Sequence, residues 1–374
     1  MTVEGAWQLL DRQLSDGRFP GYAAAVRHRD RVSYRVGGTL AADSDQPVRP
    51  DTQFRIASLT KPVAGVLALN LIGDGVLGLD DPVAGWLPEL AEPRVLRTPA
   101  SELDDTVPAE RPILVRHLLS FTAGIGLVLA ESPIQRALAE SRLAPGPLLP
   151  PFDADEYLAR AGALPLAHQP GSTWLYHCCA DLLGVLLARA TGRTLAELLA
   201  ERLTGPLGLR STAFYAADPN RLTAHYIPTA DGLRLFDPPD GRYAQPPAFE
   251  SLGGGLVSTV EDYLRFLAVF GGDTGVLDRD AVRLMTGESL RPEQRAGVAQ
   301  LMGPDVSWGL CVGLELAARE RWMAPGRFGW NGGSGTTAWI DPSRELTAVL
   351  FTSRMMLGAT GDFDDFWRAL AEEL

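Results

Sequence analysis

Residues 54–61 read FRIASLTK, and within them Ser58 and Lys61 form an S-x-x-K tetrapeptide. If a helix starts here, positions three apart share one helix face, so the lysine amine lies beside the serine hydroxyl. The positive end of the helix dipole favours an oxyanion that develops near the first turn. A serine hydroxyl is a poor nucleophile until a base takes its proton, so the pair is a candidate for nucleophilic catalysis. For the tetrapeptide alone, a serine helix cap beside a solvated lysine is the alternative.

Lys61 is the only lysine among the 34 lysine and arginine residues of the chain. The codon usage of a GC-rich genome explains most of this bias. An arginine cannot lose its proton in a protein, however, whereas a lysine can when it is removed from water. Residue 61 is therefore the first place to look for acid–base chemistry.

Strand-like segments lie near both ends of the chain. Two short runs joined by a turn at residues 28–31 predict an early hairpin, and the C-terminal third reads as further strands. The expected strands are residues 22–26, 32–36, 308–314, 327–330, 336–340 and 346–352. Apolar residues at helical spacing predict helices at residues 5–17, at residues 58–73 and at the C-terminus. Ser258 followed by Glu261 forms a capping-box pattern that predicts the start of one more helix.

Between these ends, residues 76–250 alternate helical stretches with loops rich in proline, glycine and aspartate. The expected helices are residues 114–122, 154–162, 178–191 and 195–204. We therefore expect an α+β fold in which residues 1–75 and 251–374 form one antiparallel sheet flanked by helices. Residues 76–250 would form an inserted, mostly helical lobe, and a cleft between sheet and lobe is the expected binding site.

The composition excludes several classes of protein. The chain has 374 residues, of which 46% are hydrophobic and 21% are charged, as in soluble globular proteins. With a net charge of −12, the chain lacks the excess of positive charge that is typical of proteins that bind nucleic acids or anionic membranes. We expect neither a transmembrane helix nor a secretory signal. Cys178, Cys179 and Cys311 suit neither a disulfide framework nor a zinc site, so we expect a cytoplasmic protein.

Four segments, in order, resemble one family of enzymes. They are residues 54–61, residues 115–124 (VRHLLSFTAG), residues 169–184 and residues 253–262 (GGGLVSTVED). They resemble the serine β-lactamase and penicillin-binding-protein superfamily, and within it the class C β-lactamases and the related family VIII carboxylesterases. The resemblance spans about residues 20–355. It implies a β-lactamase-like fold and a serine hydrolase that works through an acyl-enzyme on Ser58.

In that family a Y-x-N triplet places a tyrosine beside the nucleophile, and residues 176–178 stand there as Tyr-His-Cys. The resemblance implies that Tyr176 acts with Lys61 as one coupled unit, because a neighbouring ammonium stabilises a phenolate. Which of the two is the base stays open. Cys178 replaces an asparagine that helps lactamases hold their substrate. Because a thiol forms only weak hydrogen bonds, this replacement argues against β-lactam specificity. A cysteine nucleophile beside His177 is a less favoured alternative.

Residues 328–336, FGWNGGSGT, stand where the superfamily has K-T-G or H-x-G on the strand that lines the cleft. Trp330 replaces a cation that would attract a carboxylate, as in esterase-like members, so we expect a substrate that is uncharged at that end. By the same resemblance, the backbone N–H groups of Ser58 and Gly333 form the oxyanion hole. The residues expected to line the substrate site are Cys178, Trp330, Asn331 and Gly332. The glycine run alone would equally suit a flexible hairpin.

These observations predict a serine hydrolase that cleaves carboxylic esters. The alternatives on the same fold are an amidase, a D-aminopeptidase, a β-lactamase or an acyltransferase, and a further alternative is a binding protein that is acylated without turnover. No metal or cofactor is implied, because the histidines lack metal-ligand spacing and no nucleotide fingerprint occurs. The expected partner is a small-molecule ester or amide, with no nucleic acid and no membrane. The sequence leaves the oligomeric state open.

Overall fold

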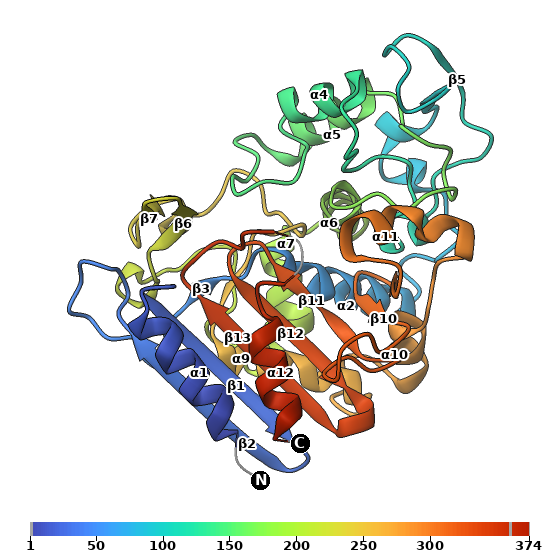
Figure 1. The fold of residues 1–374 in the computed structure, drawn as a ribbon. Coiled ribbons are helices and arrows are strands. Elements are labelled where there is room, and N and C mark those ends of the chain that lie inside the picture. The colour runs from blue at the N-terminus through green and yellow to red at the C-terminus, as the bar shows by residue number, and fades with distance from the viewer. Residues whose placement is uncertain (1–2, 359–360, 374) are drawn as a thin grey trace.

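A seven-stranded antiparallel sheet is the centre of the computed structural model, which describes residues 3–358 and 361–373 (Figure 1). Its strand order is β2-β1-β13-β12-β11-β10-β9. In that order the strands are Arg31–Gly38, Gly21–His28, Leu346–Thr352, Thr336–Asp341, Phe328–Gly332, Gly313–Glu315 and Val306–Trp308. The pairing of β1 with β13 joins the two ends of the chain, with Ala25 opposite Val349. The predicted α+β fold, with one sheet built from N- and C-terminal segments, is confirmed.

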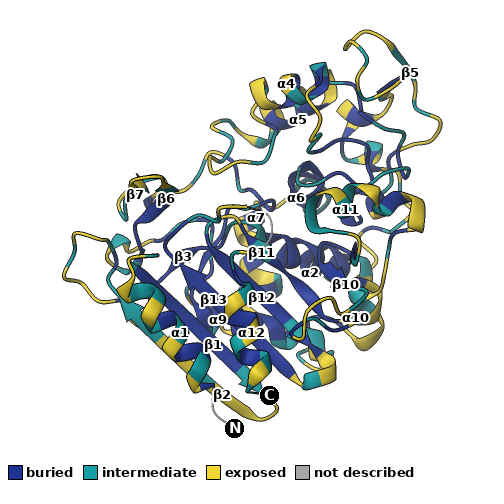
Figure 2. Ribbon diagram, in the orientation of Figure 1, coloured by how far each residue is buried: buried dark blue, intermediate teal, exposed yellow. Residues whose placement is uncertain are grey.

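Helices cover both faces of this sheet. α1 (Glu4–Ser15) and α12 (Asp364–Glu372) lie side by side on one face, and α9 (Val260–Leu267) packs against β1 and β13 from the other (Figure 1). α2 (Thr60–Gly73) is buried along most of its length and contacts α6 (Cys178–Thr191). The central strands are buried on both faces, so every residue of β13 is buried and its mostly apolar sequence does not alternate (Figure 2).

The expected strand at residues 308–314 is wrong, because the chain turns within it. β9 ends at Trp308 and β10 begins at Gly313, and the two strands pair with each other. Cys311 lies in the turn with a φ of 62°. The segment is buried throughout, so its apolar run could not distinguish one strand from a tight hairpin.

The cap of α9 is one residue away from the predicted position. The Thr259 side chain accepts the N–H of Asp262, whereas Ser258 ends strand β8 and its hydroxyl lies 2.8 Å from Thr212 Oγ1. The predicted capping box of Ser258 and Glu261 is therefore wrong, although the helix itself is present. Serine and threonine are both good caps, and only the backbone conformation distinguishes them here.

The middle of the chain contains short helices and small hairpins. The helices are α3 (Val115–Leu119), α4 (Pro133–Glu140), α5 (Ala154–Ala163), α6, α7 (Leu195–Leu199) and α8 (Gly205–Leu207). The two hairpins were not expected from the sequence; they are β4–β5 (Arg94–Leu96, Thr106–Pro108) and β6–β7 (His225–Thr229, Gly232–Asp237). β3 (Phe54–Arg55) pairs with β8 (Val257–Ser258), and α10 (Arg279–Thr286) and α11 (Ala296–Met302) follow α9. The division into residues 1–75 with 251–374 and an inserted lobe at 76–250 stays a prediction.

Because His225 is buried, we expect the folded protein to lose stability in acid. Removal from water, and then the positive charge of Arg55, lower the pKa of His225 from 6.5 to about 3. Between these values the unfolded chain binds a proton at this position and the native chain does not. The free energy of unfolding therefore falls as the pH decreases from 6.5 toward 3, by roughly 1.4 kcal/mol per pH unit.

We expect His225→Gln to remove this share of the acid sensitivity. Urea unfolding of both proteins between about pH 7.5 and about pH 4.5 measures it, because the midpoint of the variant should fall less steeply. Above about pH 7.5 the two proteins should respond to pH alike, which is the internal control. An equally steep fall in both proteins would contradict the prediction.

Candidate active site

Ser58 and Lys61 lie side by side at the start of a buried helix. Ser58 belongs to the 3-10 turn η1 (Ala57–Leu59), which leads directly into α2. The Nζ atom of Lys61 lies 2.9 Å from Ser58 Oγ. Ser58 lines a cavity, whereas Lys61 has no exposed surface. This geometry differs from the alternative of a helix cap beside a solvated lysine.

The Lys61 amine is surrounded by groups from segments that are distant in the sequence. It donates a hydrogen bond to the carbonyl oxygen of Gly253, and it lies 3.3 Å from Nδ1 of His177. The amine also lies 4.6 Å from the centre of the Tyr176 ring, a distance typical of a cation–π contact. These contacts, together with Ser58, fix the position of the amine from several directions.

The end of β11 and the start of β12 run close against the segment that precedes the serine. Thr336 Oγ1 donates to the carbonyl oxygen of Ile56 at 3.0 Å, and a Cβ on Gly332 would lie 2.3 Å from that oxygen. Only glycine permits this approach, so Gly332 determines how closely the two segments pack. Ala57, next to Ser58, has a φ of 44°, a region that side-chain-bearing residues rarely adopt. The strained turn presents Ser58 to the end of β11.

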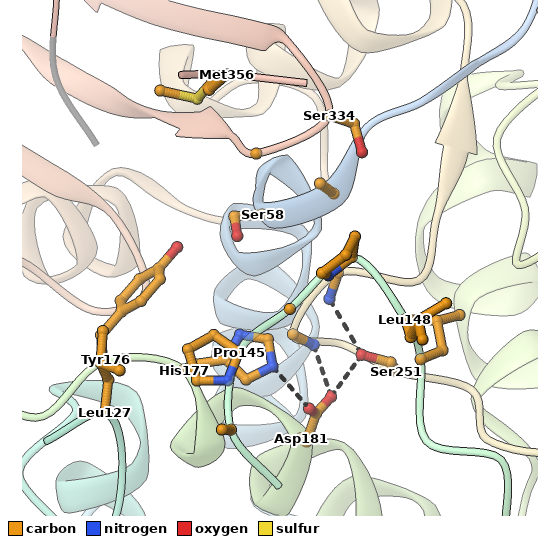
Figure 3. Close-up of a pocket in the computed structure, with 18 of the residues that line it drawn as sticks. Ser58, Leu127, Pro145, Leu148, Tyr176, His177, Asp181, Ser251, Ser334 and Met356 are labelled. Atoms are coloured by element: carbon orange, nitrogen blue, oxygen red, sulfur yellow. Dashed lines mark hydrogen bonds and ion pairs between the residues drawn. The ribbon is translucent and has the colours of Figure 1, made fainter. Parts of the chain in front are cut away.

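The phenol of Tyr176 and the hydroxyl of Ser58 project into the same cavity (Figure 3). The Tyr176 oxygen accepts a hydrogen bond from Nε1 of Trp330 at 2.6 Å. In the part of the chain that the structure describes, no hydrogen bond joins this oxygen to Lys61 or Ser58. The amine faces the ring instead of the phenol oxygen. Because the oxygen accepts the bond from Trp330, its own O–H can still donate to a molecule in the cavity.

The cavity beside Ser58 has a volume of about 380 Å³, which suits a small-molecule site. Much of its wall is apolar, formed by residues that include Leu127, Leu143, Leu148, Leu301, Met302 and Met356. A Cβ added to Gly333 would meet nothing within 4 Å, so the backbone there borders open space. Ser58 lies in the first helical turn, where N–H groups have no partner within the helix. Both backbone groups expected to form the oxyanion hole thus belong to residues that line the cavity.

His177 and Asp181 also line the cavity, although neither was among the residues expected there. Nε2 of His177 lies 3.4 Å from Asp181 Oδ2, one helical turn further along α6. Asp181 Oδ1 accepts hydrogen bonds from Ser251 Oγ at 2.7 Å and from the N–H of Gly253 at 2.8 Å (Figure 3). Burial alone would raise the pKa of Asp181, but the contacts with His177, Ser251 and Gly253 together lower it. The spacing of four residues at a helix start was the one signal of this pair in the sequence.

Cys178 was expected to line the substrate site and does not. Its side chain is buried, and the thiol donates to the carbonyl oxygen of Leu143 at 3.1 Å. Burial raises the pKa of Cys178, and it raises the pKa of Cys179 to about 12. A thiolate nucleophile at neutral pH is therefore disfavoured, and both cysteines act as small apolar residues of the core.

The other residues expected at the substrate site lie at its edge. Trp330 and Asn331 line the cavity. The Asn331 side-chain oxygen accepts from Thr337 Oγ1 at 2.7 Å and from Trp339 Nε1 at 3.0 Å, so it is engaged by the protein. Gly332 faces Ile56. Because it has no side chain, β11 can pack closely against the segment that precedes Ser58.

Comparison with known proteins identifies the family. Residues 7–373 match the family model described as Beta-lactamase. The chain belongs to the beta-lactamase family. This member is 38% identical to Protein Rv1367c of Mycobacterium tuberculosis H37Rv over 92% of its own length and 88% of the relative. It is 30% identical to Esterase EstB of Burkholderia gladioli, with 94% and 91% of the two chains covered.

A solved structure agrees with this assignment. EstCE1, described as a hydrolase with promiscuous acyltransferase activity, matches with a TM-score of 0.84 at 26% identity, covering 99% of this beta-lactamase family chain and 97% of EstCE1. The predicted β-lactamase-like fold is confirmed, and so is the prediction of an enzyme, a serine hydrolase. Within residues 3–358 and 361–373, none of the helices has the length and apolar character needed to span a bilayer.

Proposed function

We propose that this serine hydrolase cleaves carboxylic esters through an acyl-enzyme on Ser58. The contact of 2.9 Å between Lys61 Nζ and Ser58 Oγ carries the proposal, because it places a buried amine where it can take the hydroxyl proton. Ser58 Oγ attacks the ester carbonyl, and the N–H groups of Ser58 and Gly333 bind the oxyanion. The alcohol then leaves with a proton, and water releases the acid from Ser58.

The contacts of the amine and the phenol suggest different tasks for them. Lys61 touches the nucleophile directly, which favours it as the first proton acceptor. Tyr176 accepts a bond from Trp330 and lines the cavity, so its O–H is available to donate to the oxygen of the leaving alcohol. Proton transfer between Lys61 and Tyr176 would then pass through the substrate or a water molecule.

The lining of the cavity suggests an apolar substrate that is neutral beside the scissile bond. Trp330 stands where a cation would attract a carboxylate, and its N–H is engaged by Tyr176. Among the described residues that line the cavity, Arg142 carries the only guanidinium. Cys178 is buried and stands in place of the asparagine whose amide would hold the acylamino group of a β-lactam. Ester specificity with weak β-lactam turnover follows from these features.

Steady-state kinetics on two chromogenic substrates tests the proposal. We expect kcat/KM for a short-chain p-nitrophenyl ester to exceed that for a chromogenic cephalosporin by at least about 100-fold, because the site lacks groups for the lactam's carboxylate and amide. Hydrolysis of the cephalosporin faster than the ester would overturn the ester assignment. A long-lived acyl adduct without product release, seen by intact-mass spectrometry, would instead indicate an acylated binding protein.

Acyl transfer to an alcohol is a second candidate. It is favoured by the likeness to EstCE1, which is described as having promiscuous acyltransferase activity, and by the apolar cavity wall, which suits an alcohol better than water. Adding a primary alcohol to the p-nitrophenyl ester assay distinguishes the two outcomes, because transfer yields a new ester whereas hydrolysis yields only acid. An amidase would instead release amine from the matching p-nitroanilide.

We further propose a cytoplasmic protein whose partner is a small organic molecule. The support is that Cys178, Cys179 and Cys311 are free thiols, as expected in a reducing compartment. The net charge of −12 supports the expectation that the chain binds no nucleic acid.

A further inference from the structure

We propose that His177 and Asp181 form a positioning pair, in which a neutral His177 ring accepts one N–H of Lys61 and so directs the lone pair of the amine at Ser58. This inference rests on the proposed function of Lys61 as the base. The sequence pattern of the family assigns no role to the residue between Tyr176 and Cys178, so the geometry alone carries it.

The partners of the amine determine where its lone pair points. A neutral amine has two N–H groups and one lone pair. The Gly253 carbonyl can only accept, and it takes one N–H. Nδ1 of His177, at 3.3 Å, takes the other N–H if it carries no proton. The lone pair then faces Ser58 Oγ at 2.9 Å, which is the arrangement required to remove the serine proton.

Asp181 fixes the tautomer that this arrangement needs. Its Oδ2 lies 3.4 Å from Nε2 of His177, so the ring proton is placed on Nε2 and Nδ1 is left as an acceptor. Its Oδ1 is already occupied by Ser251 and Gly253. Removal from water is the largest cause that lowers the pKa of His177, so a neutral ring agrees with its burial. Gly253 connects the two ends of the network, since its N–H binds Asp181 and its carbonyl binds Lys61.

The backbone at His177 supports a functional role. Its φ of 88° and ψ of −69° correspond to a γ-turn conformation that is rare and strained for a residue with a side chain. Such strain persists only where the surrounding structure requires it. Here the turn lies at the start of α6, and it places the imidazole beside Asp181 (Figure 3), with Nδ1 3.3 Å from Nζ of Lys61. A glycine would adopt this turn without strain but would supply no ring.

Nitrogen-15 NMR of the histidine side chains tests the tautomer without depending on activity. The chain has five histidines, and comparison with His177→Gln identifies the signal of His177. We expect a neutral ring with its proton on Nε2 at neutral pH. A proton on Nδ1, or a doubly protonated ring, would overturn the proposal even if Ser58 and Lys61 are catalytic.

Asp181→Asn provides the second measurement. Because Oδ1 must still accept from Ser251 and Gly253, the amide nitrogen is forced to face Nε2 of His177. The ring proton then moves to Nδ1, where it opposes the N–H groups of Lys61. We expect kcat to fall on the order of 100-fold with KM within about threefold, and the NMR signature to change to the other tautomer. Unchanged kcat with a changed tautomer would show that the pair does not direct the amine.

Replacements of His177 separate positioning from packing. His177→Gln keeps one acceptor and one donor, so we expect kcat within about tenfold of wild type, whereas His177→Leu should lose about 100-fold. His168→Gln is the matched control, since His168 is a partly buried histidine that does not line the cavity. Equal losses in the glutamine and leucine variants would indicate a structural role only. If the leucine variant does not fold, the wild-type tautomer still decides the question.

Discussion

Ser58→Ala is expected to lower kcat by about 10⁴-fold or more, because the oxygen that forms the acyl bond is removed. The residual rate would come from substrate binding and the oxyanion hole alone. Hydrolysis of the p-nitrophenyl ester measures the rate. A fluorophosphonate that adds its mass to the wild-type protein and not to the variant identifies the modified residue.

Ser15→Ala is the matched control for this prediction. Ser15 is an exposed serine on α1, and among the described residues its hydroxyl bonds only to the backbone carbonyl of Asp11, so its loss should leave kcat unchanged. Turnover by Ser58→Ala near the wild-type rate would refute the nucleophile assignment and, with it, the acyl-enzyme. The tautomer of His177 could still be measured in that case, so a failure of the nucleophile assignment can be distinguished from a failure of the His177 proposal.

Lys61→Arg is expected to be nearly as damaging, with a loss of kcat on the order of 10³-fold. The guanidinium keeps the positive charge and can donate to Gly253, but it cannot accept the proton of Ser58. It also cannot offer a lone pair to the serine, whichever way it turns. Steady-state kinetics with the same ester measures the loss.

Because Lys61 has no exposed surface, the larger arginine could also disturb packing. Thermal unfolding of Lys61→Arg beside Lys61→Met, which keeps the approximate volume without a charge, separates the two effects. If both variants fold and both are inactive, proton transfer is the lost function. An arginine variant that works near the wild-type rate would reduce Lys61 to an electrostatic role.

The part of the site that follows helical geometry could be predicted from the sequence. The contact between Ser58 and Lys61 follows from positions three apart at a helix start, and the lone lysine drew attention to it. α6 and β13 begin and end at the residues that their apolar patterns predict. The sheet joined by both ends of the chain also follows, because strand-like segments stand at both ends.

The contacts that depend on backbone conformation could not be predicted. Nothing in the letters of residues 176–178 indicates that His177 adopts a positive φ, and only that turn aims its ring at Lys61 while Cys178 enters the core. The hydrogen bond from Trp330 to Tyr176 likewise needs two segments far apart in the sequence to meet. The chain reversal at Cys311 was hidden because every residue around it is apolar or glycine.

The burial of the single lysine has a practical consequence for labelling. Lys61 carries the only ε-amino group of the chain, and it has no exposed surface in the folded protein. Amine-reactive dyes and cross-linkers should therefore find no lysine on the native surface. Attachment of such a reagent to Lys61 would show that the active site has opened. The rate of this modification, followed by mass spectrometry, would therefore measure how often the site opens.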